Sequence, residues 1–152
     1  MPKIVSDYLE LYVFCHKTKK FLMLKRAENI ALHPGIWQTI TATAEKNEST
    51  KETLIRELTE ETGLKGAKIF LIPRINSYYM EPLDVISLSP VFLAEVKNTD
   101  VRISEEHEKF KWVSYKKAIK LIHWEDQAES LKLINKYLKN KELFTKLVEI
   151  KL

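Results

Sequence analysis

The sequence predicts a mixed α/β fold, in which a mixed β-sheet is sandwiched between helices in an α/β/α arrangement. Runs rich in β-branched and aromatic residues lie on both sides of one long helical segment, and the C-terminal part shows apolar residues at three- and four-residue spacing. The chain has 152 residues, of which 45% are hydrophobic, with only three glycines and five prolines. This composition favours one domain over residues 1–152, without linkers.

Extended segments are predicted before and after the long helix. They cover residues 8–14, 21–25, 37–44, 67–79, 85–96 and 110–113. The first two are expected to pair, because the polar turn at residues 16–20 joins them. Cys15 follows an apolar run and is expected to be a buried strand residue, and as the only cysteine it cannot form an internal disulfide.

The long helix has a recognisable start and end. Ser49 can cap its first turn, and Glu52 three residues later completes a capping box. Gly63 is typical of the residue that follows a helix. The chain is therefore predicted to be helical between Ser49 and Gly63.

Two further helices are predicted near the C-terminus. Ser114 is expected to cap a helix through residues 116–122, and Asp126 is expected to cap a second helix. The apolar stripe of the second helix is formed by Leu131, Ile134 and Leu138. These helices supply the outer layers of the predicted sandwich.

Composition and patterning argue against several classes of protein. No apolar run approaches the roughly 18 residues of a membrane span, and the start of the chain lacks a secretory signal, so a cytoplasmic location is expected. The net charge of +4 comes from scattered lysines without interleaved aromatics, so nucleic acid is not an expected partner. The four histidines show no zinc-site spacing and are expected to be structural.

Three carboxylates share one face of the long helix. Glu57, Glu60 and Glu61 fall at i, i+3 and i+4, so their side chains are neighbours. Each like-charged pair costs roughly 0.2–0.5 kcal/mol, and a bound divalent cation would reverse that sign. Magnesium takes oxygen ligands and is commonly shared between one or two carboxylates and substrate phosphates. The pattern therefore predicts a magnesium site and a polyphosphate substrate, although a solvated acidic face is the alternative.

A longer pattern surrounds these carboxylates. It consists of Glu48, seven intervening residues, and then Arg56-Glu57-Leu58-Thr59-Glu60-Glu61-Thr62-Gly63-Leu64. The pattern resembles the Nudix box, the signature of hydrolases that split nucleoside diphosphates linked to another moiety. The resemblance covers about residues 5–140 and implies the α/β/α Nudix fold. Residues 142–152 lie beyond what it explains.

One position departs from the motif. The family pattern opens with a glycine six residues before the first glutamate, and this chain has Ala42 there. The glycine carbonyl often helps to hold a metal in the family, and Ala42 is placed with the substrate-binding residues on that basis. A left-handed conformation at Ala42 would cost roughly 1–2 kcal/mol, which leaves a catalytically silent binding module open.

Roles follow for the residues of the motif. Glu57 and Glu61, one helical turn apart, are the first expected ligands of Mg²⁺, for which Mn²⁺ can substitute, and Glu60 is a third. By resemblance, Arg56 orients a glutamate of the box, and its position four residues before Glu60 allows that ion pair. Arg56 and Glu60 are thus expected to be catalytic. Glu48 is expected to act through hydrogen bonds behind the ligands.

A general base is expected outside the motif. The segment at residues 104–113 offers three carboxylates just before a strand, and many Nudix enzymes place a metal-binding or catalytic glutamate on this loop. Glu106 is the favoured candidate and Glu105 the alternate. All three can also be ordinary loop acids.

A second resemblance concerns the substrate. Its residues are Phe21-Leu22-Met23-Leu24-Lys25-Arg26, Trp37-Gln38-Thr39-Ile40-Thr41, Glu106-His107, Trp112 and Trp124. Together they resemble the dihydroneopterin triphosphate pyrophosphohydrolase branch of the Nudix family, also known as dATP pyrophosphohydrolases. This implies that Lys25 and Arg26 hold phosphates and that Trp37 stacks on the heterocycle, where an aromatic face contributes about 1–3 kcal/mol. For Trp37, a place in the core is the alternative.

Three functions remain open from the sequence. The first is a pyrophosphohydrolase of a nucleoside or dihydroneopterin triphosphate, and the second a hydrolase of a substituted nucleoside diphosphate such as ADP-ribose or a dinucleotide. The third is a nucleotide-binding module without turnover. In each case the expected partner is a small-molecule phosphoanhydride, and a homodimer is left open.

Overall fold

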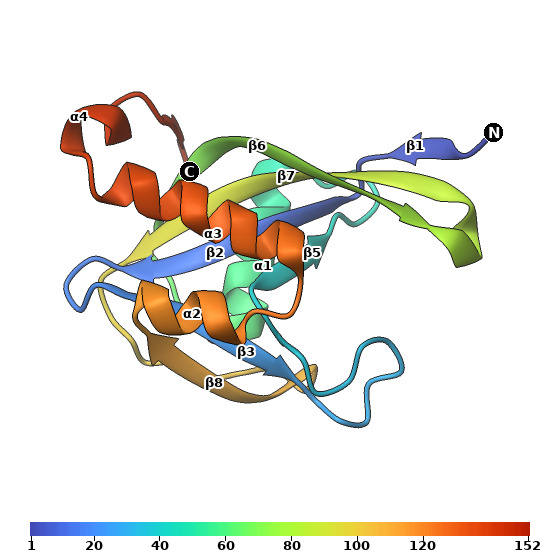
Figure 1. The fold of residues 1–152 in the computed structure, drawn as a ribbon, viewed down its shortest axis with the longest axis horizontal. Helices are drawn as coiled ribbons and strands as arrows, with labels where there is room; N and C mark the ends of the chain where they lie inside the picture. The colour runs from blue at the N-terminus through green and yellow to red at the C-terminus, as the bar shows by residue number, and fades with distance from the viewer.

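A nine-stranded mixed sheet runs through the computed structural model, which describes residues 1–152, and helices cover both of its faces (Figure 1). The strands are β1 Lys3–Val5, β2 Tyr8–Cys15, β3 Lys20–Arg26, β4 Trp37–Gln38, β5 Ile40–Thr43, β6 Lys68–Met80, β7 Val85–Val96, β8 His107–Val113 and β9 Val148–Ile150. The helices are α1 Thr50–Thr62, α2 Tyr115–Leu121, α3 Glu125–Leu138 and α4 Lys141–Phe144, with a 3-10 turn at Glu81–Leu83. The predicted α/β/α sandwich is confirmed.

Two hydrophobic cores hold the layers together, one on each face of the sheet. Leu54 and Leu58 of α1 belong to the first core, whereas Leu131 and Ile134 of α3 belong to the second. Strand β2 serves both, because its side chains alternate between the faces: Leu9, Leu11, Val13 and Cys15 enter the first core, and Tyr12 and Phe14 the second. Full burial of each such leucine stabilises the fold by about 1.5–3 kcal/mol.

Strands β2 and β3 form the predicted pair but soon separate. They are paired only at Phe14 with Phe21 and at Cys15 with Lys20. Beyond that point β2 continues between β7, which is parallel to it, and β5, whereas β3 continues beside β8 and β4. The sheet is therefore split between β2 and β3.

The segment predicted as one strand at residues 37–44 crosses this split. Gln38 in β4 pairs with Leu24 of β3, whereas Ile40 in β5 pairs with Leu11 of β2. Between them, the hydroxyl of Thr39 donates a hydrogen bond of 2.6 Å to the carbonyl of Leu11. The prediction of one continuous strand is wrong, because the two halves pair with strands that have already separated.

Helix α1 has the predicted ends. Ser49 is its N-cap, and the side chains and amides of Ser49 and Glu52 form both hydrogen bonds of the capping box. Gly63 follows the helix with φ at 71°, and its amide donates to the carbonyl of Thr59 at 2.8 Å. A residue with a side chain would be strained at this φ.

The two C-terminal helices depart from their predicted caps. Ser114 is the N-cap residue of α2, but its side chain makes no capping hydrogen bond. Helix α3 begins at Glu125 with Trp124 as N-cap, so the prediction of Asp126 as the cap is wrong. The amide of His123 donates to the carbonyl of Trp37 at 2.9 Å, and this contact fixes where the chain enters α3. Asp126 lies in the first turn instead.

Several elements lie outside the predicted ones. Strand β1 pairs in parallel with β7, and β8 begins at His107, three residues before the predicted strand. Residues beyond the Nudix resemblance form α4 and β9, and β9 extends the sheet by pairing with β6. None of the helices is both long enough and apolar enough to cross a membrane.

The two serine caps allow a matched test. We expect Ser49→Ala to lower the free energy of unfolding by about 1 kcal/mol, because it removes the acceptor of a capping hydrogen bond. Ser114→Ala should change it little, because that side chain caps nothing. Urea denaturation of both variants measures the difference. Equal effects of the two substitutions would contradict the assigned roles.

Candidate active site

The three carboxylates of α1 differ strongly in exposure. The side chain of Glu60 is 55% exposed, whereas those of Glu57 and Glu61 are 13% and 8% exposed. Because Glu57 and Glu61 lie one turn apart, both flank the sheet side of the helix, and Glu60 lies toward solvent. The shared face predicted from spacing is present, but its members meet different surroundings.

The guanidinium of Arg56 lies among four carboxylates, those of Glu45, Glu48, Glu57 and Glu60. Its Nε and Nη2 donate to the two oxygens of Glu48 at 2.7 and 2.9 Å, and its Nη1 donates to Glu57 at 2.9 Å. The same Nη1 donates to Glu60 at 3.1 Å, which is the ion pair expected from the spacing. The hydrogen bonds to the Glu48 carboxylate raise the pKa of Arg56 above its ordinary value. Arg56 thus offsets the like-charge repulsion along the helix.

Glu48 joins the loop before α1 to the helix. Arg56 and the backbone amide of Glu45 hold the pKa of Glu48 at about 2. The hydroxyl of Thr53 also donates to Glu48 at 2.8 Å, and Arg56 Nη2 reaches the carbonyl of Thr43 at the end of β5 at 2.9 Å. Glu48 therefore acts through hydrogen bonds, and its eight-residue separation from Arg56 spans the turn that precedes the helix.

Glu61 is buried against the segment that leads into β8. Its Oε2 accepts hydrogen bonds from Ser104 Oγ at 2.7 Å and from His107 Nδ1 at 2.9 Å. Burial alone would raise the pKa of Glu61, but the hydrogen bonds from His107 and Ser104 outweigh it and the pKa is lowered. Glu61 is therefore ionised in spite of its burial.

The pKa of Glu57 is shifted in the opposite direction to that of Glu61. Burial raises the pKa of Glu57, and the nearby charge of Glu61 adds to this, whereas the hydrogen bond from Arg56 opposes it without cancelling it. Two carboxylates one turn apart thus differ in how readily they hold a proton. A cation between them would favour the ionised form of both.

The loop glutamates lie close to this group of residues. Glu105 and Glu106 are exposed, and neither side chain accepts a hydrogen bond from the protein. The amide of Glu106 donates to Ser104 Oγ at 3.3 Å, and its carbonyl accepts from the amide of Ala27 at 2.9 Å. Since Ser104 also holds Glu61, the backbone of Glu106 is tied to α1 through one hydroxyl.

The two basic candidates at the end of β3 differ in availability. The ammonium of Lys25 lies 2.5 Å from Glu108 and 3.6 Å from Glu28, so it is already paired. Arg26 donates through Nε to the carbonyl of Leu32 at 2.9 Å, and its two Nη atoms donate to no protein group. The charge of Arg26 also contributes to the lowered pKa of Glu61. Arg26 is therefore the cation near the carboxylates that can still bind an anion.

Trp37 and Ala42 lie on different sides of the split sheet. The Trp37 ring packs against the core beneath α2 and α3, and the ammonium of Lys111 lies 5.0 Å from its centroid. Ala42 is fully buried in the core beneath α1 and pairs with Leu9 in β5. Its φ is not positive, so the left-handed strain considered above does not arise.

The carboxylates of α1 do not form a complete metal cage on their own. No three histidine, cysteine, aspartate or glutamate side chains are arranged to hold an ion. Magnesium, however, usually keeps several waters and takes only one or two carboxylates together with substrate phosphates. The donor set fits that pattern, because the side-chain hydrogen bonds to Glu57 and Glu61 each fall on one oxygen only.

Reasoning from the sequence missed His107, Ser104 and Gln38. His107 was grouped with three other histidines, all of which are exposed, whereas His107 is 6% exposed and contacts Glu61. The Glu106-His107 pair within the second resemblance was the available signal. Spacing could not find the contact, because Glu61 and His107 lie 46 residues apart.

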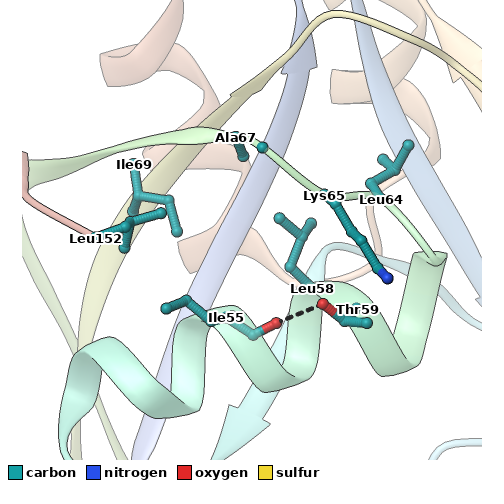
Figure 2. A pocket seen from close by; sticks show the side chains of 9 residues that line it. Ile55, Leu58, Thr59, Leu64, Lys65, Ala67, Ile69 and Leu152 are labelled. Atoms are coloured by element: carbon teal, nitrogen blue, oxygen red, sulfur yellow. Dashed lines mark hydrogen bonds between the residues drawn. The ribbon is translucent and has the colours of Figure 1, made fainter.

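A second hollow lies on the other flank of α1. This groove has a volume of about 310 Å³. Figure 2 shows Ile55 and Leu58 of the helix on one side of it and Ile69 and Leu152 on the other. Its lining is mainly apolar, and Lys65 is its only ionisable side chain. It lacks the carboxylates, so the candidate site is the Arg56 cluster rather than this groove.

Comparison with known proteins settles the family. The NUDIX domain model matches residues 11–134. The chain belongs to the Nudix family. The dihydroneopterin triphosphate diphosphatase of Haemophilus influenzae is 31% identical over 141 residues, which cover 84% of each chain. Mouse bis(5'-nucleosyl)-tetraphosphatase (asymmetrical) is 28% identical over 130 residues, 81% of this chain and 83% of that one.

The fold agrees with this assignment. The structure of the E. coli dihydroneopterin triphosphate pyrophosphohydrolase superposes with a TM-score of 0.73 and 18% identity, covering 89% of this chain and 99% of that one. The 31% identity to the Haemophilus influenzae enzyme confirms the resemblance to the dihydroneopterin triphosphate branch, whereas the E. coli structure shows that the fold is shared. The protein is a Nudix hydrolase that acts on nucleotide phosphoanhydrides, and Nudix hydrolases generally use divalent metal ions.

The Arg56–Glu48 pair predicts a pH dependence of stability. Because the folded-state pKa of Glu48 is about 2, below its ordinary value of 4.5, its contribution to stability is complete above pH 4.5. The contribution is lost as the pH falls from 4.5 towards 2. Urea denaturation at pH 6 and pH 3 should therefore show a smaller acid-induced loss of stability in Glu48→Gln than in the unaltered Nudix protein.

A matched control is Glu45→Gln. The carboxylate of Glu45 is 71% exposed and lies 3.9 Å from Arg56, so its removal should leave the acid-induced loss unchanged. The assignment is wrong if the two variants lose the same stability between pH 6 and pH 3.

Proposed function

We propose that this chain is a Mg²⁺-dependent Nudix pyrophosphohydrolase that cleaves a nucleoside or dihydroneopterin triphosphate to the monophosphate and pyrophosphate. The observation that carries this proposal is the arrangement of α1, in which Arg56 pairs with the carboxylates while the buried Glu61 accepts hydrogen bonds from Ser104 and His107. The identity to a dihydroneopterin triphosphate diphosphatase supports the choice of substrate class.

The carboxylates of α1 are proposed to hold the cation. Glu57 and Glu61 are the first ligands, because each offers an oxygen without a side-chain hydrogen bond, and Glu60 is a third from the solvent side. The ion supplies charge neutralisation on the phosphates and activation of a water molecule. Arg56 keeps Glu57 and Glu60 oriented through Nη1.

Residues around the carboxylates are proposed to handle the phosphates and the proton. Arg26 binds phosphate oxygens with its free guanidinium nitrogens, and Lys25 joins it only when Glu108 releases the ammonium. Glu106 accepts a proton from the attacking water as the anhydride bond breaks and pyrophosphate leaves. The exposure of Glu106 and its link to Glu61 through Ser104 support this role.

The heterocycle is proposed to lie on the Trp37 side of the split. Trp37 is only partly buried in β4, and β4 pairs with β3 beside Lys25. Stacking on an aromatic face tolerates many bases and contributes about 1–3 kcal/mol. Ala42, whose side chain is buried, contributes through its backbone.

A second candidate substrate is a dinucleoside polyphosphate. The specific observation in its favour is the 28% identity to mouse bis(5'-nucleosyl)-tetraphosphatase (asymmetrical) over 81% of the chain. The same carboxylates would serve this reaction, because the bond broken is again a phosphoanhydride. A catalytically silent binding module was considered because of a left-handed conformation at Ala42, and Ala42 carries no such strain.

The product that is released distinguishes the two candidate substrate classes. In the presence of Mg²⁺, we expect dihydroneopterin triphosphate or a deoxynucleoside triphosphate to release pyrophosphate. Phosphorus NMR identifies the products, and ADP-ribose and diadenosine tetraphosphate are assayed in parallel as competing substrates.

The metal ligands are tested by substitution. Glu57→Gln and Glu61→Gln should each lower kcat about a hundredfold or more, because a metal site supplies several kcal/mol of charge stabilisation. Glu142→Gln in α4 is the matched control and should keep the unaltered rate. Turnover unaffected by the first two variants would refute the metal assignment.

The two loop acids can be separated by the same assay. Glu106→Gln should lower kcat by a factor of about 10² to 10⁴, the range of general-base catalysis. Glu105 is the neighbouring residue and is also exposed, so Glu105→Gln should remain near the unaltered rate. A larger loss in Glu105→Gln would transfer the role of base to Glu105.

A further inference from the structure

His107 differs from the other histidines of the chain in its surroundings. It is the only buried one of the four and lies at the first residue of β8. Its ring lies between Glu61 of α1 and Gln38 of β4, both of which are also buried. A buried imidazole with a partner on each ring nitrogen has a fixed orientation.

The hydrogen bonds around His107 have a defined direction. The amide nitrogen of Gln38 can only donate, so at 3.3 Å it donates to Nε2 of His107. The ring proton then lies on Nδ1, which donates to Glu61 Oε2 at 2.9 Å. Gln38 thus selects the tautomer that can donate to the carboxylate.

Ser104 completes the arrangement from the same segment. Its hydroxyl donates to the same oxygen, Glu61 Oε2, at 2.7 Å. Both donors therefore meet one oxygen, and Oε1 of Glu61 accepts no hydrogen bond. This oxygen is not sealed in the interior either, because the only buried side-chain oxygen or nitrogen without a partner belongs to Gln127. The Glu61 carboxylate is held by one oxygen and open at the other.

We propose that His107, supported by Gln38 and assisted by Ser104, is a positioning residue that orients the Glu61 carboxylate for cation binding. The proposal rests on the proposed function, in which Glu61 is a ligand. Two donors on Oε2 prevent rotation of the carboxylate and leave Oε1 as the only oxygen that a cation can reach. Substitution of partners that orient a ligand typically weakens metal binding 10- to 100-fold.

The segment containing His107 has an attachment to α1 that does not involve the imidazole. The amide of Arg102 donates to the carbonyl of Thr62 at 2.9 Å, and Ala27 donates to the carbonyl of Glu106 at 2.9 Å. These backbone contacts remain when the His107 side chain changes. A substitution of His107 therefore tests the donor to Glu61 rather than the position of the whole segment.

The test measures Mn²⁺ binding to the full chain without substrate, by electron paramagnetic resonance of the free ion. We expect His107→Phe, which keeps a ring but removes the donor, to raise the dissociation constant about 10- to 100-fold. His107→Asn is the matched variant, because its amide nitrogen takes nearly the place of Nδ1, and it should restore most of the affinity. Ser104→Ala should weaken binding by a smaller factor, since His107 still donates.

The outcomes separate this inference from the proposed function. If His107→Phe remains folded by circular dichroism and binds Mn²⁺ as the unaltered protein does, His107 does not position Glu61, although the Nudix activity stands. Equal losses in His107→Phe and His107→Asn would also overturn the donor role. If His107→Phe does not fold, Ser104→Ala and Gln38→Leu decide, and unaltered binding in both refutes the proposal. Absence of Mn²⁺ binding in the unaltered protein would overturn this inference, whereas the proposed function is tested separately by Mg²⁺-dependent release of pyrophosphate.

Discussion

The concentration of carboxylates on α1 has to be compensated within the protein, and Arg56 provides that compensation. Its guanidinium donates to Glu48, Glu57 and Glu60 at once, and also to the carbonyl of Thr43. A lysine could not reach this set, because an ammonium is a point donor whereas the guanidinium is a planar fork. The helix, the loop before it and the end of β5 are thereby joined through one side chain, and the ligands proposed for the cation are oriented before any cation binds.

The split between β2 and β3 decides which segments can meet at α1. Because the two strands pair only at their turn, β4 and β8 follow β3, whereas β5 and β7 follow β2. Gln38 in β4 and His107 in β8 are thus brought together beside Glu61. Arg26 at the end of β3 reaches the same region. The site depends on an interruption of the sheet as much as on the motif.

The surroundings of the site explain why its substrate is set by more than the motif. The motif residues are proposed to hold a cation and phosphates, and none of them is proposed to contact a base. The groups that differ among phosphoanhydride substrates would meet Trp37, Arg26 and the loop of Glu106, which belong to three separate elements. Relatives that act on dihydroneopterin triphosphate and on dinucleoside tetraphosphates share similar identity with this chain. We therefore expect side chains outside α1 to determine which substrate is cleaved.

The sequence by itself determined the long helix, its capping box, its terminal glycine and the Arg56–Glu60 pair, because these depend on spacings within a few residues. It also placed most strands, because runs rich in β-branched and aromatic residues mark them. Tertiary structure alone decided the break at Thr39, the start of α3 at Glu125 and the contact of His107 with Glu61. Each depends on segments distant in the chain, and so does the pairing that leaves Arg26, not Lys25, free. Local pattern carries no information on such contacts, because burial and pairing are fixed only when the sheet assembles.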